Sequence, residues 1–317
     1  MLLISVITPC FNAAAYLRDA IDSVLNQTHK NIELILVNDG STDETEAIIK
    51  SYSDERIRYY YQENKGQCAA SNFGLSVAKG DYIKFFDADD VMNDTHLEAQ
   101  LKKLNGRTNA VSSCAWGRFY DHNPLSARFI PESVWKDMKP LQWLKLSLQQ
   151  PADMMGGWLW LIPQELIKKA GGWNEGLSLN NDFEFSTRLL LHAEEVLFTP
   201  DAKVFYRSGN QTLSVAKTEA AYRAAFLSTN LGCSYLLNSE NSLEMKMICA
   251  NRYQQWIYRI YPNYPSLLKE METEVQKLGG SNIKMEGGVT FKLLMKLFGW
   301  RAARRIQLYF YKAGYRP

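Results

Sequence analysis

Three carboxylates lie within four residues at Asp87, Asp89 and Asp90, directly after an apolar run over residues 82–86. Like charges this close repel one another, so the cluster is costly unless a cation neutralises it. Carboxylate oxygens suit Mg²⁺ or Mn²⁺, which often bind through one or two carboxylates together with substrate phosphates. The cluster therefore predicts a divalent-metal site. Its alternative is a solvated loop in which Asp89 or Asp90 caps a helix over residues 95–104.

A second polar group, Asn38-Asp39-Gly40-Ser41, follows the apolar run at residues 32–37. Asp39 at a strand end could accept hydrogen bonds from a nucleotide base or ribose. Ser41, with Glu44 three residues later, has the spacing of a helix-capping box. Taken alone, the segment is also ordinary turn chemistry between a strand and a helix.

The elements that must position these groups alternate between strands and helices. Strands are predicted at residues 3–8, 32–37, 56–60 and 82–86, and helices at 13–25 and 67–78. Such alternation indicates a mostly parallel sheet covered on both faces. Ligands bind such sheets at the carboxyl ends of the strands, which here are followed by residues 9–12, 38–41 and 87–90. These three segments are therefore expected to form one site.

The alternation weakens after about residue 105. Later strands are expected at residues 110–119, 158–162 and 196–198, with a helix at 182–193. From about residue 217 the pattern is helical. The sequence thus predicts an α/β domain over residues 1–215 and a helical C-terminal extension over 216–317.

Composition narrows the class of protein. The hydrophobic content of 46% fits a globular chain, and a net charge of +2 argues against a nucleic-acid partner. Five scattered cysteines without a CxxC pair are typical of reduced core thiols, and no stretch approaches the ~18 apolar residues of a membrane span. A cytoplasmic protein is therefore expected.

The C-terminal tail is positively charged, unlike the rest of the chain. From residue 289 onward there are seven basic residues and no acidic one, interleaved with aromatic and aliphatic side chains. This mixture suits an anionic membrane surface, and it predicts a peripheral position on the inner face of the plasma membrane. The alternative is a helix that packs on the domain and leaves a solvated basic face.

Four motifs in order carry a family resemblance: residues 4–12 (ISVITPCFN), 37–43 (VNDGSTD), 64–75 (NKG and AASNFGL) and 78–90 (AKGDYIKFFDADD). Together they resemble glycosyltransferase family 2, the inverting enzymes with the GT-A fold. Residues 170–177 and 181–188 are similar to the acceptor-side motif of that family. The resemblance covers about residues 3–215 and implies a mixed sheet flanked by helices.

The resemblance implies a role for each aspartate. Asp39 is expected to contact the nucleotide base, Asp87 the ribose, and Asp89 a Mn²⁺ or Mg²⁺ ion on the diphosphate, while Asp182 is the catalytic base. The other expected nucleotide-sugar contacts are Thr8, Pro9, Phe11, Asn12, Lys65, Gly66, Asn72 and Ala88. The acceptor is expected near Asp90, Trp158, Trp173 and Asn181. For both tryptophans, packing in the core is an equal alternative to stacking on a sugar.

The implied reaction is inverting transfer of a sugar from a nucleotide diphosphate, with a lean to UDP, to a hydroxyl of a glycan or lipid-linked acceptor. It points to cell-surface polysaccharide synthesis. Three positions depart from the family pattern: Asn181 stands where a glutamate is frequent, Ser71 replaces an arginine, and Gly209 occupies a usual histidine position.

Two alternatives share the same fold. A nucleotidyltransferase has a comparable core and acidic pair, but its first loop is rich in glycine and basic, whereas residues 9–15 contain neither glycine nor lysine. The other alternative is a non-catalytic sugar-binding protein. The joint presence of Asp39, Asp87, Asp89 and Asp182 argues against it.

Overall fold

The computed structural model of the chain describes residues 2–120, 123–149, 154–209 and 218–312. The chain divides into two compact units, Met1–Ala216 and Lys217–Pro317. The domain boundary expected between residues 215 and 216 lies outside the described residues. Each unit is described separately below.

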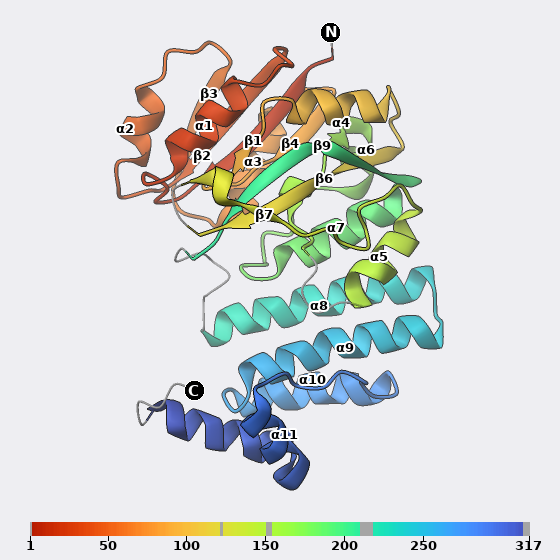
Figure 1. Cartoon of the computed structure of the whole chain (residues 1–317). Helices are drawn as coiled ribbons and strands as arrows, with labels where there is room; N and C mark the ends of the chain where they lie inside the picture. Colours follow the sequence, from red (N-terminus) through yellow and green to blue (C-terminus); the bar gives the residue numbers. More distant parts are fainter. Residues whose placement is uncertain (1, 121–122, 150–153, 210–217, 313–317) are drawn as a thin grey trace. The chain divides into compact units, whose positions relative to one another are not determined.

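The first unit is built around a five-stranded sheet with four parallel strands, flanked by helices (Figure 1). The strands in spatial order are β3 (Ile57–Gln62), β2 (Ile32–Asp39), β1 (Ile4–Cys10), β4 (Tyr82–Phe85) and an antiparallel β8 (Ile162–Pro163). The parallel strands are joined by α1 (Leu17–Leu25), α2 (Thr45–Lys50) and α3 (Gln67–Val77). Because β1, β2 and β4 are buried along almost their whole length, they read as continuous apolar runs.

A second sheet has four strands, in the order β5 (Val91–Met92), β9 (Glu195–Arg207), β6 (Ala110–Phe119) and β7 (Arg128–Phe129). β6 is parallel to β9, whereas the β5–β9 and β6–β7 pairs are antiparallel. The remaining helices of the unit are α4 (His96–Leu104), η1 (Pro124–Ser126), α5 (Pro140–Gln149), η2 (Gly157–Leu159), α6 (Gln164–Ala170) and α7 (Asn181–His192). The expected mixed α/β class is therefore confirmed.

Two predicted helix starts differ from the structure. The first helix begins at Leu17 instead of residue 13, because residues 14–16 form a turn; the amides of Ala13 and Ala14 donate to Thr45 Oγ1 and Asp43 Oδ2. The predicted capping box at Ser41 is wrong. Ser41 Oγ accepts the Asn12 amide, and α2 begins only at Thr45, whose amide donates to Asp43 Oδ1.

Of the strand expected at residues 158–162, only the end is observed, as a bridge at Leu161 and the start of β8. The segment forms the 3₁₀ turn η2 and only the two-residue strand β8. The carbonyls of Trp158 and Leu159 accept hydrogen bonds from the side chains of Lys84 and Gln100, so they are not available to a strand ladder. Side chains thus take the place of a neighbouring strand as hydrogen-bond partners of this turn.

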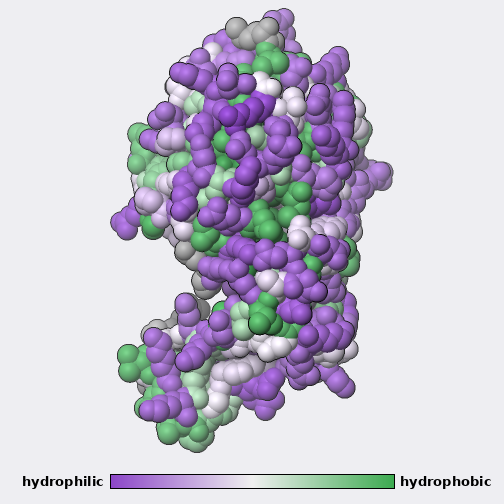
Figure 2. Space-filling view, turned by 90° about the vertical axis from the view of Figure 1, so that its right-hand side faces the viewer, coloured by the Kyte–Doolittle hydropathy of each residue, from purple (hydrophilic) through white to green (hydrophobic). Residues whose placement is uncertain are grey.

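The second unit contains four helices: α8 (Glu219–Ser239), α9 (Leu243–Ile260), α10 (Pro265–Lys277) and α11 (Val289–Lys312). α11 is interrupted at Gly299, whose φ of 77° is non-helical. Figure 2 shows hydrophobic side chains on the surface at the level of α11, among charged ones. Within the described residues, no helix is long and apolar enough to cross a membrane. All five cysteines are buried free thiols, as the sequence predicts.

Candidate active site

The acidic cluster follows β4 at the carboxyl edge of the five-stranded sheet, as expected from the sequence. Asp87 and Asp89 are half-buried, and Asp90 is fully buried. Asp90 Oδ1 accepts the backbone amide of Arg207 at 2.8 Å. Neither Asp89 nor Asp90 caps α4, because that helix begins after Thr95 without a side-chain cap. The solvated-loop alternative is therefore wrong.

Burial and mutual repulsion make ionisation of this cluster costly. Burial raises the pKa of Asp87 well above its usual range, and the charges of Asp89 and Asp182 raise it further. The pKa of Asp90 is raised in the same way by burial and by the charges of Asp89 and Asp87. Asp182 therefore lies close enough to the cluster to be felt electrostatically, although it is distant in sequence.

The residues present fit a divalent cation that is completed by a substrate. Asp90 Oδ2 is buried without a hydrogen-bond partner in the described structure, and Asp87 and Asp89 lie beside it in sequence with partial exposure. Across the described residues, no group of three or more His, Cys, Asp or Glu side chains could hold a metal alone. Mg²⁺ and similar ions commonly take one or two carboxylates and fill the remaining positions with phosphate oxygens and water.

Asp39 fixes the loop that follows β3. Its carboxylate is 2% exposed and accepts the amides of Lys65 and Gly66, both at 2.8 Å, together with the Gln62 side chain at 2.6 Å. The structure therefore joins three predicted donor-site residues, Asp39, Lys65 and Gly66, in one turn. The sequence pattern alone did not predict that Asp39 fixes this turn by accepting hydrogen bonds from its backbone amides.

The loops after β1 and β2 are hydrogen-bonded to each other and form one wall of the candidate site. Asn12 has a left-handed φ of 49°; its amide donates to Ser41 Oγ at 3.0 Å and its Oδ1 accepts the Thr42 amide at 2.8 Å. Phe11 is 51% exposed beside this pair, whereas Thr8 is buried in β1. Pro9 is half-buried in the same strand and Ala88 is buried between the aspartates. An exposed ring on an ordered loop is available to stack on a flat ligand.

Helix α3 connects the donor side to the acceptor side. Gln67 Nε2 donates to Asp87 Oδ1 at 3.2 Å, and Gln67 Oε1 accepts from Asn181 at 3.3 Å. The Gln67 side chain thus connects Asn181 to Asp87 of the acidic cluster. Asn72 instead pairs with the backbone of Trp173 in both directions, at 2.7 and 2.8 Å, so it holds the loop before α7.

Asp182 lies in the first turn of α7, where the helix dipole favours a negative charge. Its Oδ1 accepts the Gly157 amide at 2.8 Å. Burial raises its pKa to about 6, although the Gly157 hydrogen bond acts in the opposite direction. A carboxylate with this pKa is ionised at neutral pH and is still basic enough to take a proton.

Glu184, the other carboxylate near Asp182 in sequence that could act as a base, is paired with Arg188. It is 1% exposed and makes a bidentate ion pair with Arg188, at 2.7 and 3.0 Å. Arg188 also donates to the carbonyls of residues 170, 171 and 172. Glu184 therefore organises the glycine-containing loop before α7.

The two candidate tryptophans are packed against other aromatic rings. Trp158 is 4% exposed and stacks on Tyr206, with ring centroids 5.5 Å apart. Trp173 is 7% exposed and stacks on Phe185 at 4.0 Å. Of the two alternatives left open by the sequence, this geometry favours core packing for both.

Arg207 is a site residue that sequence reasoning did not assign. Its guanidinium is 2% exposed, donates to the Asp89 carbonyl and to Asp19, both within 2.9 Å, and lies over the rings of Tyr16 and Phe119. It brings a buried positive charge next to the acidic cluster. Its position in the Tyr206-Arg207 pair just before Gly209 was the available signal.

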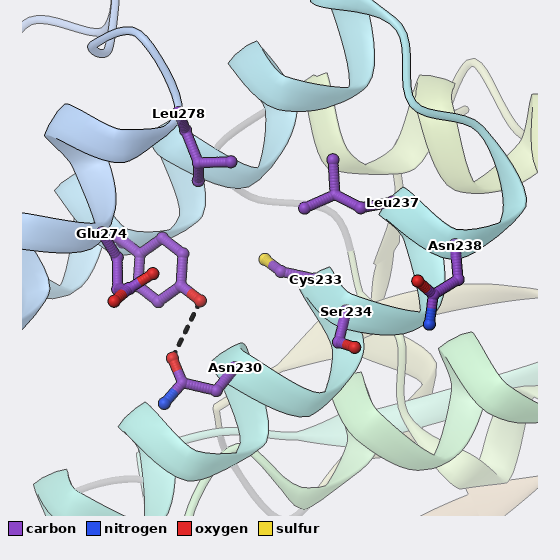
Figure 3. Close-up of a pocket in the computed structure, with 8 residues that line it drawn as sticks. Asn230, Cys233, Ser234, Leu237, Asn238, Glu274 and Leu278 are labelled. Carbon is purple, nitrogen blue, oxygen red and sulfur yellow. Dashed lines mark hydrogen bonds between the residues drawn. The ribbon is translucent and has the colours of Figure 1, made fainter.

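A pocket of about 360 Å³ lies elsewhere, in the helical unit (Figure 3). Residues from α8, α9 and α10 line it, and Tyr253 donates to Asn230 Oδ1 at 2.8 Å. Cys233, Glu274 and Leu278 surround that pair. None of the predicted site residues lies in it.

Structural comparison shows the same fold in S. aureus TarS. The structure of its residues 1–349 with UDP-GlcNAc matches 100% of this chain and 93% of that one, with a TM-score of 0.63 at 16% identity. The corresponding UDP complex gives a TM-score of 0.61 at 17% identity, covering 99% and 92% of the two chains. At such identities the likeness concerns the fold.

Sequence comparison gives closer relatives. An uncharacterised glycosyltransferase of Rickettsia typhi is 38% identical over 192 residues, 59% of this chain and 58% of that protein. A second from Rickettsia felis is 37% identical over 59% of this chain but only 31% of its own length. Glycosyltransferase GlyG of Streptococcus pneumoniae is 30% identical over 231 residues, 68% of this chain and 74% of that protein. The chain therefore spans between about a third and three quarters of these relatives.

The family model of glycosyl transferase family 2 matches residues 5–171. That segment is more than half of the 317 residues and contains all of β1 except Ile4, β2 to β4, the acidic cluster and the Gly157 turn. The match agrees with the fold and with the order of the motifs. The chain belongs to glycosyl transferase family 2.

Proposed function

We propose that this protein transfers a sugar from a nucleotide diphosphate to an acceptor hydroxyl with inversion at the anomeric carbon. One observation carries the proposal. The fold brings Asp182, held by the Gly157 amide, within electrostatic reach of Asp87 in the acidic cluster. This arrangement supports a metal-bound diphosphate at the acidic cluster with a separately held base next to it. The UDP and UDP-GlcNAc complexes of S. aureus TarS support a UDP-sugar donor.

On the donor side, the loops after β1, β2 and β3 hold the nucleotide. The proposed contacts are the exposed Phe11 ring for the base, the Asp39 turn beside it, and Asp87 for the ribose. Asp89 would hold Mn²⁺ or Mg²⁺ with the diphosphate oxygens. When bound, such an ion supplies positive charge that stabilises the leaving nucleoside diphosphate. Arg207 donates its side-chain Nε to the Asp89 carbonyl and its backbone amide to the Asp90 carboxylate, so both residues keep their places.

On the acceptor side, Asp182 takes the proton of the attacking hydroxyl as the new glycosidic bond forms. A single displacement with one base on the face opposite the leaving group inverts the anomeric carbon, the same logic as in inverting glycosidases. Asn181 lies between this base and Gln67, which contacts Asp87. These three side chains link the two halves of the site.

The proposed acceptor is a glycan or a lipid-linked glycan at a membrane, as in the synthesis of surface polysaccharides. Helix α11 supports this part of the proposal. Val289, Leu293, Leu297 and Phe298 are each more than half exposed, and the exposed Lys292 and Lys296 lie among them. Phe291 of the same turn is 6% exposed, so the helix has one packed face and one apolar, basic outer face. Anionic lipid offers the complementary surface.

The first prediction concerns the metal. We expect UDP to stabilise the wild-type protein against thermal unfolding only when Mn²⁺ or Mg²⁺ is present, because the ion offsets the repulsion between diphosphate and carboxylates. Asp89→Ala should abolish this metal-dependent shift and weaken UDP binding by at least ~10-fold. Titration calorimetry with and without metal measures both. Equal UDP affinity in all four combinations of protein and metal would contradict it.

The second prediction concerns the base. Asp182→Asn is nearly isosteric and can keep the Gly157 hydrogen bond, so we expect a folded protein with unchanged donor affinity. Transfer should fall at least ~10²-fold, the usual scale for loss of a general base. Steady-state transfer to a polymer or lipid-linked acceptor measures the loss.

Glu184→Gln is the matched control for the base. Glu184 is two residues along α7, about 200° around the helix axis, and is paired with Arg188. We expect a loss of thermal stability but a much smaller loss of turnover than in Asp182→Asn. If Asp182→Asn turns over normally while Glu184→Gln does not, the assignment of the base is wrong.

The third prediction concerns pH. Because the folded-state pKa of Asp182 is about 6, the base is ionised above this pH and protonated below it. In the metal-free protein, the ¹³C chemical shift of the Asp182 carboxyl should therefore titrate with a midpoint at about pH 6, and Asp182→Asn identifies the signal because it lacks this group. A midpoint at about pH 4, the ordinary aspartate value, would refute the assigned environment.

The fourth prediction concerns the membrane. The combined change Leu293→Ser, Leu297→Ser and Phe298→Ser should reduce sedimentation with phosphatidylglycerol liposomes at least ~10-fold, because each side chain contributes about 1.5–3 kcal/mol when buried. Added salt should weaken binding of the unaltered chain. Leu243→Ser, at an 86% exposed leucine of α9, is the control and should bind normally. Equal binding of all three proteins would exclude α11 as the attachment surface.

A further inference from the structure

Lys84 is a lysine in the core of the first unit, and the proposed reaction does not use it. It lies in the middle of β4, three residues before Asp87, and its side chain is 0% exposed. No salt bridge to Lys84 is found within the described part of the chain. Burying a charge without an opposite charge is costly unless hydrogen bonds compensate for the lost water. A reason is therefore needed for an ammonium here.

The ammonium is bound to two neutral groups, one carbonyl of η2 and the side chain of Gln100 in α4, which itself holds the next carbonyl of η2. Lys84 Nζ donates to the Trp158 carbonyl at 2.6 Å and to Gln100 Oε1 at 3.1 Å. Gln100 Nε2 in turn donates to the Leu159 carbonyl at 3.1 Å and to the Ser112 carbonyl at 2.9 Å. Lys84 and Gln100 thus hold two consecutive carbonyls of η2. Burial lowers the pKa of Lys84 to about 8, so the ammonium is present at neutral pH.

The same turn holds Asp182. The amide of Gly157, one residue before Trp158, donates to Asp182 Oδ1 at 2.8 Å. From the other side, Ser186 of α7 donates to the Met155 carbonyl and accepts from the Trp160 ring nitrogen. Gly157 packs closely against the Trp173 ring, since a β-carbon there would lie 2.7 Å from it, and this contact limits movement of the turn in that direction. The placement of the Gly157 amide therefore depends on what anchors η2.

We propose that Lys84 is a positioning residue for Asp182: through the Trp158 carbonyl and Gln100 it fixes η2, and η2 fixes the carboxylate that receives the acceptor proton. The inference rests on the proposed function in its last step, the use of Asp182 as base. The anchoring itself is independent of that step. Lys84 touches neither substrate nor carboxylate, and it acts only through the backbone of the turn.

The test is Lys84→Met, which keeps the length and apolar part of the side chain and removes its donors. We expect kcat to fall ~10- to 10²-fold, the scale of a misplacement of about 1 Å, with the donor KM within twofold of wild type. Hydrogen exchange of the Gly157 amide should accelerate at least ~10-fold while the amides of β1 keep their protection. Glycine labelling with ¹⁵N and ¹³C isolates this amide among only four Gly–Gly pairs of the sequence.

Two further variants keep the outcome decisive. Gln100→Met removes the second anchor of η2 but retains the ammonium, so it should produce the same two changes and serves if Lys84→Met does not fold. Ser5→Ala is the control. Ser5 is equally buried in the adjacent strand β1 and donates to Glu33, away from η2, so kcat and Gly157 exchange should stay unchanged.

A folded Lys84→Met protein with normal Gly157 exchange, or with normal kcat, would overturn the inference. General acceleration of all amides, in β1 as well as at Gly157, would also overturn it, since it would reduce Lys84 to a stabilising core residue. Failure of the proposed function looks different. In that case Asp182→Asn would retain turnover while the exchange of Gly157 still depended on Lys84.

Discussion

Repulsion among carboxylates at the end of β4 is the constraint on which the rest of the site depends. Burial and neighbouring charges raise the pKa of both Asp87 and Asp90, and Asp182 adds to the charge near Asp87. A fold that assembles such a group must supply compensation from elsewhere. Here it comes from Arg207, from the backbone, and in the proposed reaction from a metal and its diphosphate.

Backbone amides carry much of that compensation. Asp39 accepts the amides of residues 65 and 66, Asp90 accepts that of residue 207, and Asp182 accepts that of residue 157. An amide gives a carboxylate a directed partner without adding another mobile charge. Three segments that are distant in sequence, at residues 65–66, 157 and 207, are thus each fixed by one aspartate.

The strand–helix alternation and the order of the motifs were enough to predict the fold class and the sheet edge at which the polar segments after the strands gather. Parallel strands buried on both faces leave a strong apolar signal, and polar residues directly after them are conspicuous. The tertiary partners were not predictable in this way. Arg207 is 117 residues from Asp90, and nothing local to either residue marks the pair.

Prediction failed where side chains replace backbone partners. Residues 13–16 have helical spacing, but Thr45 and Asp43 hold the amides of Ala13 and Ala14. Residues 158–162 have strand composition, but Lys84 and Gln100 hold the carbonyls of Trp158 and Leu159. A local pattern of hydrophobic residues cannot predict these hydrogen bonds, because the side chain that makes each bond is far away in sequence. For Trp158 and Trp173 the deciding factor was likewise tertiary, namely the rings of Tyr206 and Phe185.

The paired loops after β1 and β2 have a consequence for how a nucleotide is received. Ser41, Asp43 and Thr45 of one loop satisfy the amides of Asn12, Ala14 and Ala13 of the other, and Gly40 at a φ of 73° packs so closely that a β-carbon would lie 2.8 Å from the Asn64 amide. These segments therefore have their conformation before a ligand arrives, and association does not spend binding energy on ordering them. In the proposed function, such a preformed wall favours fast capture of the nucleotide, and a change of nucleotide preference in evolution would require coordinated replacement in both loops.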